Sequence, residues 1–424
     1  MDLIKELEWR GLIQDIMPGT AEQLNKEMTS GYIGFDPTAD SLHIGSLLPI
    51  IILKHLQIAG HKPFALIGGA TGMIGDPSFK SQERNMLSEK ELENNLNGIR
   101  KQLNQFLDFD RSKPNAAEIV NNYDWFREMN FLDFIRDVGK HITINYMMSK
   151  DSVRKRLEGT SGISFTEFTY QLIQGYDFYW LYKHKNCKLQ MGGSDQWGNI
   201  TTGTELIRRK SGGEAFAFTC PLLKKADGSK FGKSEQGNVW LDAEKTSPYQ
   251  FYQFWLNAAD ADAEQWIRIF TFLNKEEIET IVAAHKQDAS KRLLQKTLAK
   301  EITLFVHGAA EYQKAIETTE KLFSKQDAPI ETFSEADLEG MEGIIKVNFE
   351  RSRIENMDVI SFLSETAVFP SKGEARKMIQ NGGVSINRKK VMEISEPVNE
   401  HRLLHDKFLL VQKGKKNYYL VTLQ

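Results

Sequence analysis

Apolar and polar positions divide the chain into three regions with different periodicities. Up to about residue 221, short apolar runs alternate with longer stretches in which apolar residues recur every three or four positions. The runs at 31–35, 63–67, 119–121 and 188–191 predict β-strands, and each is followed by Gly, Pro or polar residues and then by a helical stretch. Strands that alternate with helices in this way are typical of a parallel α/β sheet.

The second region, residues 246–324, has almost no Gly or Pro, and its apolar residues repeat with the period of a helix. It predicts a helical domain, and the acidic segment that follows predicts a linker. The last region predicts helices near 358–366 and over 372–380, then strands over VSIN, KKVMEI and a final hairpin around Gly414. This third region is expected to be a small α+β module.

Charge is distributed unevenly along the chain, although the formal net charge is only -3. Residues 371–424 hold 11 Lys and Arg against 5 Asp and Glu, which is +6, so the preceding residues carry -9. A basic module on a mildly acidic body favours contact with RNA, and a solvated basic surface would give the same pattern.

The two cysteines, Cys187 and Cys220, form no CxxC motif, so the sequence predicts neither a disulfide framework nor a zinc or other metal site. This cysteine usage fits a reducing cytosol, and we expect a cytoplasmic protein. The first residues carry charges throughout, unlike a signal peptide, and no apolar run reaches the roughly 18 residues of a membrane span.

Residues 32–60 read as a strand, a polar loop and a helix that begins close to His43. Loops at the carboxyl ends of parallel strands bind ligands, and a helix N-terminus favours an anion there. His43 and Thr38 would offer donors to a phosphate, and Gly34 and Gly45 would let a ligand approach the backbone. The alternative is an ordinary helix start at which the histidine caps its own backbone.

A second candidate is the loop KADGSKFGKSEQGNVW at 225–240. Lys230 and Lys233 flank a Phe-Gly step, so both ammonium groups could reach a polyphosphate and stabilise the charge that grows during attack on phosphorus. A basic surface turn would look the same.

The third candidate is a predicted helix over 165–178. Tyr170, Gln174 and Asp177 fall at positions i, i+4 and i+7, so they share one face, which bulky apolar residues border on both sides. This pattern indicates a buried recognition face, and a solvent-exposed polar stripe is the alternative.

The motifs HIGS at 43–46 and KFGKS at 230–234 resemble the paired HIGH and KMSKS motifs of class I aminoacyl-tRNA synthetases. Nearly the whole chain is similar to bacterial tyrosyl-tRNA synthetases, in blocks such as YIGFDPTADSLHIG, LIGGATGMIGDPS, GISFTEFTYQLIQGYDF and LQMGGSDQWGNI. Ser46 departs from the family pattern, which has histidine at a position that touches the ATP ribose or adenine region. A weaker bond to ATP, or none, is implied there.

The resemblance implies a role for each matching residue. Tyrosine would be bound through its ammonium group by Asp76, Tyr170 and Gln174, and through its hydroxyl by Tyr32 and Asp177. ATP and the adenylate would be bound by Gly34, Asp36, His43, Gly45, Ser46, Asp195, Gln196 and Lys233. Catalysis would rest on Lys233, Lys230, His43, Thr38, Lys80 and Arg84, the last two in a mobile loop over the pyrophosphate.

The resemblance also implies the architecture: a Rossmann-like catalytic domain at 1–221, the KFGKS loop and a helical domain at 222–325, a linker at 326–349 and an RNA-binding domain at 350–424. The last domain resembles a module shared by a ribosomal small-subunit protein and RNA pseudouridine synthases. Its expected tRNA contacts are Lys372, Arg376, Lys377, Arg388, Lys389 and Lys390. ATP with Mg²⁺, L-tyrosine and tRNA(Tyr) would be the substrates of a homodimer without a tightly bound cofactor or a membrane anchor.

Three other functions share part of this pattern. A tryptophanyl-tRNA synthetase would lack the pair Tyr32 and Asp177, and a small nucleotidylyltransferase would explain neither the KFGKS loop nor the basic module. A non-catalytic RNA-binding or splicing cofactor is expected to have lost Lys233 or Asp177, and both are present.

Overall fold

The computed structural model describes residues 1–76, 87–158, 162–229, 231–234, 237–323, 333–339, 341, 344–355, 357–401, 403–414 and 417–424. The chain divides into two compact units, one formed by residues 1–242 with 259–294 and the other by residues 243–258 with 295–424. Among the described residues, none of the helices combines the length and the apolar character that a bilayer span requires.

The first unit is built on a six-stranded sheet with the order β1-β6-β5-β2-β3-β4. Its strands are β1 (Asp15–Ile16), β2 (Ser30–Phe35), β3 (Lys62–Ile67), β4 (Glu118–Asn121), β5 (Cys187–Gly193) and β6 (Phe216–Cys220). All neighbouring pairs from β6 to β4 are parallel, and β1 joins the edge in the antiparallel sense. The four strands predicted from the sequence are confirmed, and β1 and β6 were not predicted.

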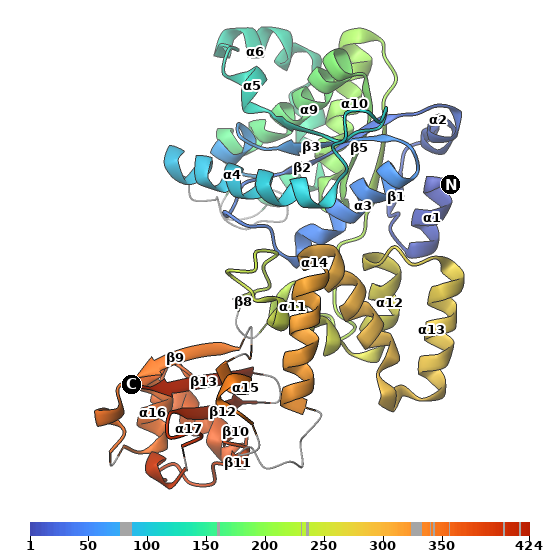
Figure 1. Ribbon diagram of the computed structural model, residues 1–424. Helices are drawn as coiled ribbons and strands as arrows, with labels where there is room; N and C mark the ends of the chain where they lie inside the picture. The colour runs from blue at the N-terminus through green and yellow to red at the C-terminus, as the bar shows by residue number, and fades with distance from the viewer. Residues whose placement is uncertain are drawn as a thin grey trace. The chain divides into compact units, whose positions relative to one another are not determined.

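Helices cover both faces of this sheet (Figure 1). On one face lie α3 (Leu47–Ile58) and α4 (Glu89–Phe106), and on the other lie α9 (Phe165–Lys185) and α10 (Trp197–Ser211). The last two pack closely, because a Cβ atom at Gly203 of α10 would come within 2.9 Å of Phe178 of α9. The smaller elements of this unit are α1 (Leu3–Arg10), α2 (Thr20–Lys26), η1 (Ile44–Ser46), η2 (Thr71–Met73), α5 (Tyr123–Phe126), α6 (Phe131–Asp137), η3 (Gly139–His141), α7 (Ile144–Met148), α8 (Asp151–Leu157), η4 (Ser194–Gln196), β7 (Lys233–Ser234), β8 (Gly237–Asn238), α12 (Asp260–Phe270), α13 (Lys275–Gln287) and η5 (Ala289–Lys291).

Strand order reverses between β2 and β5. From β2 the chain adds β3 and β4 on one side, and from β5 it adds β6 on the other. Loops that leave such neighbouring strands in opposite directions open a crevice at the carboxyl ends, which is where α/β sheets bind ligands. The topology therefore places the expected site next to β2 and β5.

The N-terminus of α9 is fixed by a buried ion pair. The guanidinium of Arg156 in α8 donates two hydrogen bonds to the carboxylate of Glu167, at 3.1 and 2.7 Å, and a third to the carbonyl of Gly162. The two side chains are only 9% and 2% exposed. Since the pair is bidentate and the guanidinium has a further acceptor, the cost of burying the two charges is offset, and the first turn of α9 is held in place.

Arg10 holds α12 in a similar way. Its side chain is almost fully buried and donates to the carbonyls of Arg268, Thr271 and Leu273, while Glu6 accepts from its Nε atom. A cation at the C-terminal end of a helix satisfies carbonyl groups that have no partner within the helix. The first helix of the chain therefore stabilises the end of α12.

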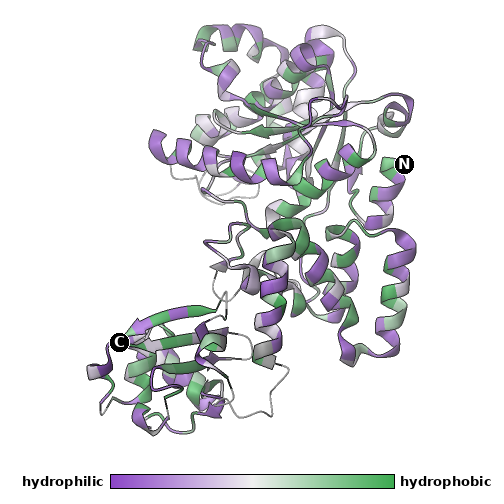
Figure 2. Ribbon diagram, viewed as in Figure 1, coloured by the Kyte–Doolittle hydropathy of each residue, from purple (hydrophilic) through white to green (hydrophobic). Residues whose placement is uncertain are grey.

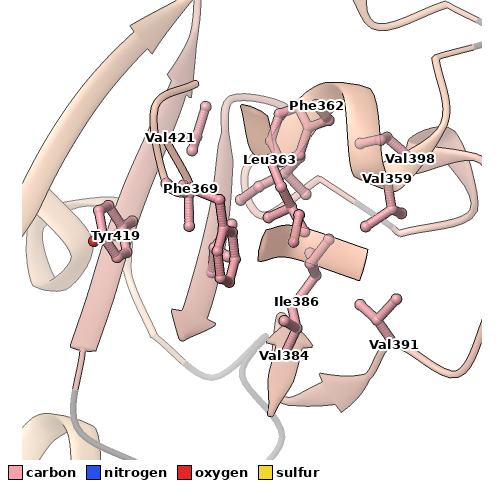
Figure 3. Packing of buried hydrophobic residues seen from close by; sticks show 14 of the residues in the cluster. Val359, Phe362, Leu363, Phe369, Val384, Ile386, Val391, Val398, Tyr419 and Val421 are labelled. Carbon is pink, nitrogen blue, oxygen red and sulfur yellow. The ribbon is translucent and has the colours of Figure 1, made fainter. Parts of the chain in front are cut away.

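The second unit contains a five-stranded sheet with the order β11-β10-β12-β13-β9. Its strands are β9 (Ile345–Phe349), β10 (Val384–Ile386), β11 (Lys389–Lys390), β12 (Phe408–Lys413) and β13 (Asn417–Leu423), and its helices are α11 (Pro248–Leu256), most of α14 (Leu293–Phe323), α15 (Glu335–Glu339), η7 (Arg351–Arg353), α16 (Val359–Glu365), α17 (Lys372–Gln380) and η8 (Val398–Glu400). Apolar residues concentrate in the central strands (Figure 2). Phe362 and Leu363 of α16 pack there with Val384, Ile386 and Val421 of the sheet (Figure 3).

The structure confirms most predicted elements outside the first sheet and corrects two. Helices fill the region 246–324, and α16, α17 and the final hairpin lie where they were predicted. The expected linker over 326–349 is wrong at its end, because β9 pairs in parallel with β13 and belongs to the sheet. The predicted strand KKVMEI contains only the two residues of β11.

The helical region is also not a unit of its own. Contacts assign α12 and α13 to the first unit, and they assign α11 and most of α14 to the second. The sequence boundary at 222–325 therefore does not appear as a separate compact body in the described structure.

Candidate active site

A cavity of ≈ 590 Å³ opens at the carboxyl ends of β2 and β5. It lies where the strand order reverses, as the topology requires. The residues predicted from the sequence that line it are Tyr32, Gly34, Asp36, Thr38, Gly45, Asp76, Tyr170, Gln174, Asp177, Asp195 and Gln196. They come from β2, α9 and the loops that follow β2, β3 and β5, so the fold brings together segments up to about 160 residues apart.

One of the most buried residues that line this cavity is Asp177, which is 1% exposed. Trp125 donates to its Oδ1 atom at 2.9 Å, and Asn122 donates to its Oδ2 atom at 3.1 Å. Burial raises the pKa of Asp177 to about 8, although both hydrogen bonds act in the opposite direction.

Tyr32 lies at the same end and is 1% exposed, yet its hydroxyl has no hydrogen-bond partner among the residues that the structure describes. Burial raises the pKa of this phenol well above its ordinary value, so the group is a neutral hydroxyl. The Oε1 atom of Gln190 on β5 is likewise buried without a described partner, and Gln190 also lines the cavity. A buried polar atom without a partner is costly, so this end is suited to a ligand that supplies one.

Asp36 sits at the centre of a second group of hydrogen bonds. Tyr170 donates its hydroxyl to one oxygen of Asp36 and Thr71 donates to the other, both at 2.8 Å. Asn122 donates to Thr71 and to Asp177. The carboxyl groups of Asp36 and Asp177 are therefore linked through the hydroxyl of Thr71 and the amide of Asn122. Because Tyr170 uses its proton on Asp36, the lone pairs of its oxygen remain available to accept from a ligand.

A third group connects Gln174, Asn199, Gln196 and Asp76. Asn199 donates to the side-chain oxygens of Gln174 and Gln196, at 3.0 and 3.2 Å, and Gln196 donates to Asp76 at 2.7 Å. Three carboxylates, of Asp36, Asp76 and Asp195, therefore line one cavity. Their negative charge favours a cationic group such as an ammonium. Within the described part of the chain, no cluster of three His, Cys, Asp or Glu side chains is arranged to hold a metal ion.

His43 precedes the short helix η1, and its imidazole caps that helix. The Nδ1 atom accepts from the backbone N–H of Gly45 at 3.0 Å, so the alternative that this histidine caps its own backbone is the one observed. Burial lowers the pKa of His43, and the neutral ring with Nδ1 as acceptor carries its proton on Nε2. The cap thus leaves one donor, Nε2–H, for a ligand.

Gly45 is required by this cap more than by ligand approach. A Cβ atom at Gly45 would lie 2.7 Å from Cε1 of His43, so any other residue would push the ring away. Gly45 itself lines the cavity, whereas His43 and Ser46 do not line its described part. The side chain of Ser46 makes no capping bond to α3.

The residues that follow KFGKS are joined by backbone hydrogen bonds to the HIGS region. The N–H of Ile44 donates to the carbonyl of Val239 at 2.9 Å, and that of Leu241 donates to Leu42 at 2.8 Å. Phe231 and Lys224 line the cavity. Lys80, Arg84 and Lys230 lie outside the described residues, and Lys233 is described only by its backbone, in β7.

In the second unit, the cations expected to bind tRNA do not form one uniform set. Lys372, Arg376, Lys377, Lys389 and Lys390 are exposed. Arg388 instead donates to the carbonyl of Leu322 at 3.2 Å, and its guanidinium lies 5.1 Å from the ring centre of Phe333. Arg388 is therefore half-buried and already engaged by the protein, unlike the exposed cations, and its expected contact with tRNA stays a prediction.

Comparison with known proteins agrees with this geometry. Residues 24–324 match the family described as tRNA synthetases class I (W and Y), and residues 339–421 match the tyrosine–tRNA ligase SYY-like C-terminal domain. A tyrosine–tRNA ligase of Porphyromonas gingivalis is 58% identical over 430 residues, which cover 100% of both chains. One of Cytophaga hutchinsonii is 59% identical over 426 residues and 99% of both chains.

The chain belongs to the tyrosine–tRNA ligase family.

A solved member of this family has the same fold. The C-terminally truncated mitochondrial tyrosyl-tRNA synthetase of Aspergillus nidulans is 30% identical, with a TM-score of 0.68. The match covers 76% of this chain and 94% of that one. The α/β sheet with its flanking helices is therefore the class I synthetase fold, as the sequence resemblance implied.

Several residues of this tyrosine–tRNA ligase site were not found from the sequence. Asn122 and Trp125 hold Asp177, Thr71 holds Asp36, and Asn199 holds Gln174 and Gln196. Gln190 presents its unpaired oxygen to the cavity. No periodicity in the segment NNYDWF at 121–126 indicates that Asn122 and Trp125 point towards a residue more than 50 positions away.

We expect the replacement Asp177→Asn to change how stability depends on pH. Because the pKa of Asp177 is about 8 in the folded protein and near 3.8 when unfolded, this group contributes stability below about pH 4, and the contribution is lost as pH rises towards 8. The free energy of unfolding of the variant, minus that of the wild type, should therefore increase between pH 4 and 8 by on the order of 1 kcal/mol per pH unit.

Urea unfolding of both proteins at several pH values measures this difference. It should become constant above about pH 8, where the folded wild type is also ionised. A difference that does not vary between pH 5 and 8 would show that Asp177 is already ionised in the fold.

Proposed function

We propose that this protein activates L-tyrosine with ATP and transfers it to the 3′ end of tRNA(Tyr). The observation that supports this most directly is the end of the cavity at Tyr32 and Asp177, where a buried hydroxyl without a described partner lies near a buried carboxyl group. A phenol is a ligand that fills an apolar, aromatic-walled end and also brings a hydroxyl to it.

Selection against phenylalanine follows from the same groups. Without the substrate hydroxyl, Tyr32 would stay unpaired in a dry environment, and that cost is what separates two substrates of nearly equal shape. Tyrosyl-tRNA synthetases are themselves the standard example of this effect, with a discrimination of about 10⁵.

The amino-acid backbone of the substrate would lie among the acidic groups. We propose that Asp76, Tyr170 and Gln174 accept from the ammonium, since all three line the cavity and Tyr170 has free lone pairs. Asp36, Asp195 and Gln196, with the backbone of Gly34, would position the ribose and the reacting carboxylate of the substrate.

Adenylate formation needs no nucleophile from the protein. A carboxylate oxygen of tyrosine attacks the α-phosphorus of ATP, the bond from phosphorus to the bridging oxygen breaks, and pyrophosphate leaves with the electron pair. The protein contributes position and charge. We propose that His43, through Nε2–H, and Thr38 donate to the phosphates, and that Lys230, Lys233, Lys80 and Arg84 neutralise the leaving pyrophosphate. A hydroxyl of the terminal tRNA ribose then attacks the carbonyl carbon, and AMP leaves.

Magnesium fits this scheme as a partner of ATP. The carboxylates of Asp36 and Asp76 are already engaged by hydrogen bonds from Thr71, Tyr170 and Gln196. Mg²⁺ commonly keeps several waters and binds substrate phosphates with few protein ligands. We propose that it enters with ATP and supplies charge neutralisation there.

Since charging of tRNA serves translation, we also propose a cytoplasmic location.

Exchange of labelled pyrophosphate into ATP tests the proposed activation step. It should depend on tyrosine and be supported neither by tryptophan nor, at equal concentration, by phenylalanine.

Asp177→Ala should lower kcat/KM for tyrosine by a factor of about 100 or more and leave kcat/KM for phenylalanine nearly unaffected, because only the phenol uses this carboxyl. Exchange with tryptophan instead of tyrosine would reject the assignment. Absence of exchange with every amino acid tested would favour a non-catalytic RNA-binding protein.

For tRNA we propose the exposed cations of the second unit. Lys372, Arg376 and Lys377 lie on α17. Lys389 and Lys390 form β11, and the ammonium of Lys390 lies beside Gly382, just beyond the end of that helix. These exposed charges lie along α17 and just beyond its C-terminal end. Contacts of this kind bind phosphates with an affinity that falls with salt concentration.

Reversal of two of these charges should separate tRNA binding from activation. The double variant Lys389→Glu with Lys390→Glu is expected to raise the KM for tRNA by about tenfold or more and to reduce the salt dependence of charging. Pyrophosphate exchange should not change. Lys314→Glu, an exposed lysine of α14, serves as the matched control. An unchanged KM for tRNA in the double variant would remove these cations from the proposal.

We further propose a homodimer through an apolar surface of the first unit. Phe131 and Leu132 of α6 are 64% and 75% exposed, and Ile144 of α7 and Phe165 of α9 are 59% and 65% exposed. These elements adjoin one another, because α6, α7 and the start of α9 share one buried core cluster. Contiguous exposed apolar residues mark an interaction surface, and a second copy is the commonest partner.

Leu132→Asp should therefore yield a monomer in sedimentation velocity at concentrations where the wild type sediments as a dimer. Ile58→Asp, at an exposed position of α3, is the control and should leave the sedimentation coefficient unchanged. A wild-type monomer, or a dimer that survives Leu132→Asp together with Phe131→Asp, would contradict the proposed interface.

A further inference from the structure

We propose that Phe231 is a positioning residue. Its ring packs against α12, and this fixed contact, called the aromatic pivot, holds the KFGKS loop in place for attack on ATP. This inference rests on the proposed function and assigns a role to α12, which contacts α3 and α13. It concerns the backbone and ring of Phe231, which the structure describes.

The ring of Phe231 packs against two aromatic rings of α12, which together are called the aromatic seat. It stacks on Phe270 with ring centres 5.3 Å apart and planes inclined by 20°, and it meets Trp266 edge-on at 5.0 Å. Trp266 and Phe270 are 2% and 1% exposed, so the seat belongs to the rigid core. Aromatic pairs in these geometries stabilise their arrangement beyond the area that they bury.

Phe231 also lines the cavity. Phe231 is only half-buried, with part of its surface on the seat and part on the ligand side. A residue needed for core packing alone has no reason to border the cavity. Phe231 therefore connects the core to the place where the substrate would lie.

A second contact ties the start of the loop to the same helix. The N–H of Ala226 donates to the carboxylate of Asp262 at 2.7 Å, and Asp262 is buried. Asp262, Trp266 and Phe270 are spaced by four residues, so they form one stripe along α12. This stripe carries both the start of the loop and its aromatic pivot.

The end of the loop is fixed on the HIGS segment. Val239 and Leu241 exchange hydrogen bonds with Ile44 and Leu42, and His43 pairs with Trp240 in an isolated bridge. Gly232, directly after the pivot, has a φ of 100°, a conformation that favours glycine and turns the chain back towards that bridge. The loop is thus held at its start, at Phe231 and at its return.

This arrangement determines where the neighbouring cations can act. Lys233 lies two residues after Phe231, and its backbone forms β7, so a fixed pivot limits the position of its Cα atom. Preorganised charge lowers a barrier only if it is held where charge develops, and a displacement of about 1 Å can cost a factor of about 100. The pivot should matter for turnover and hardly at all for binding of tyrosine, whose proposed contacts lie on β2, α9 and the loop after β3.

The test compares Phe231→Leu and Phe270→Leu with the matched control Phe272→Leu, whose ring packs against His55. Both test variants keep an apolar side chain and lose the ring contact. We expect kcat for pyrophosphate exchange to fall by about tenfold, equivalent to about 1.4 kcal/mol, with the KM for tyrosine within a factor of two. Phe231→Tyr, which retains the ring, should restore most of the rate, and Phe272→Leu should exchange like the wild type.

A double-mutant cycle separates positioning from general damage. If the two rings act through their contact, Phe231→Leu with Phe270→Leu should be no slower than the slower single variant. Additive losses, or a KM for tyrosine that rises in parallel with the fall in kcat, would overturn the proposal. Wild-type exchange in the same assay tests the proposed function separately, so its absence would count against that function and not against the pivot.

Discussion

Burial of one carboxyl group constrains the whole first unit. Asp177 lies in the interior of α9, where an uncompensated negative charge would be prohibitively costly, and its pKa is raised accordingly. Its two hydrogen bonds come from the segment that follows β4, while Tyr32 faces the same cavity from β2. Strands β2 and β4 and helix α9 must therefore all be in their native positions before this end of the cavity forms. The ion pair of Arg156 and Glu167 and the close contact at Gly203 hold α9 in that position.

The side of the cavity formed by the HIGS and KFGKS segments is organised differently. Among the described residues, its order comes from backbone hydrogen bonds between the HIGS region and the residues that follow KFGKS, and from the contacts of Phe231 with α12. Arg10 stabilises the far end of α12, so even the first helix of the chain contributes to the support of this loop. The buried end is thus suited to recognition of a fixed shape. The loop side is suited to charges that must be well placed only when phosphate is attacked.

In the second unit, consecutive basic residues have different environments. The sequence Asn387-Arg388-Lys389-Lys390 looks like one basic patch, but Asn387 and Arg388 both have positive φ angles, and the turn directs Arg388 inwards to Leu322 and Phe333. Only the two lysines remain exposed. A turn of this kind gives consecutive residues opposite environments, and their charges alone do not reveal which of them faces water.

The sequence by itself determined the periodic elements and the family. Strands β2 to β5, the polar stripe of α9 and the helices of the second region follow from patterns whose period is that of the backbone, and the two signature motifs are contiguous. Tertiary structure alone decided the partners: Asn122 and Trp125 for Asp177, Asn199 for Gln174, α12 for Phe231, and β13 for the strand β9 inside the expected linker. It also decided that His43 caps its own helix, and that the helical region divides between two units. Such pairings join residues tens to hundreds of positions apart, and no local period records them, because packing and hydrogen bonding across the fold select them only after the elements have formed.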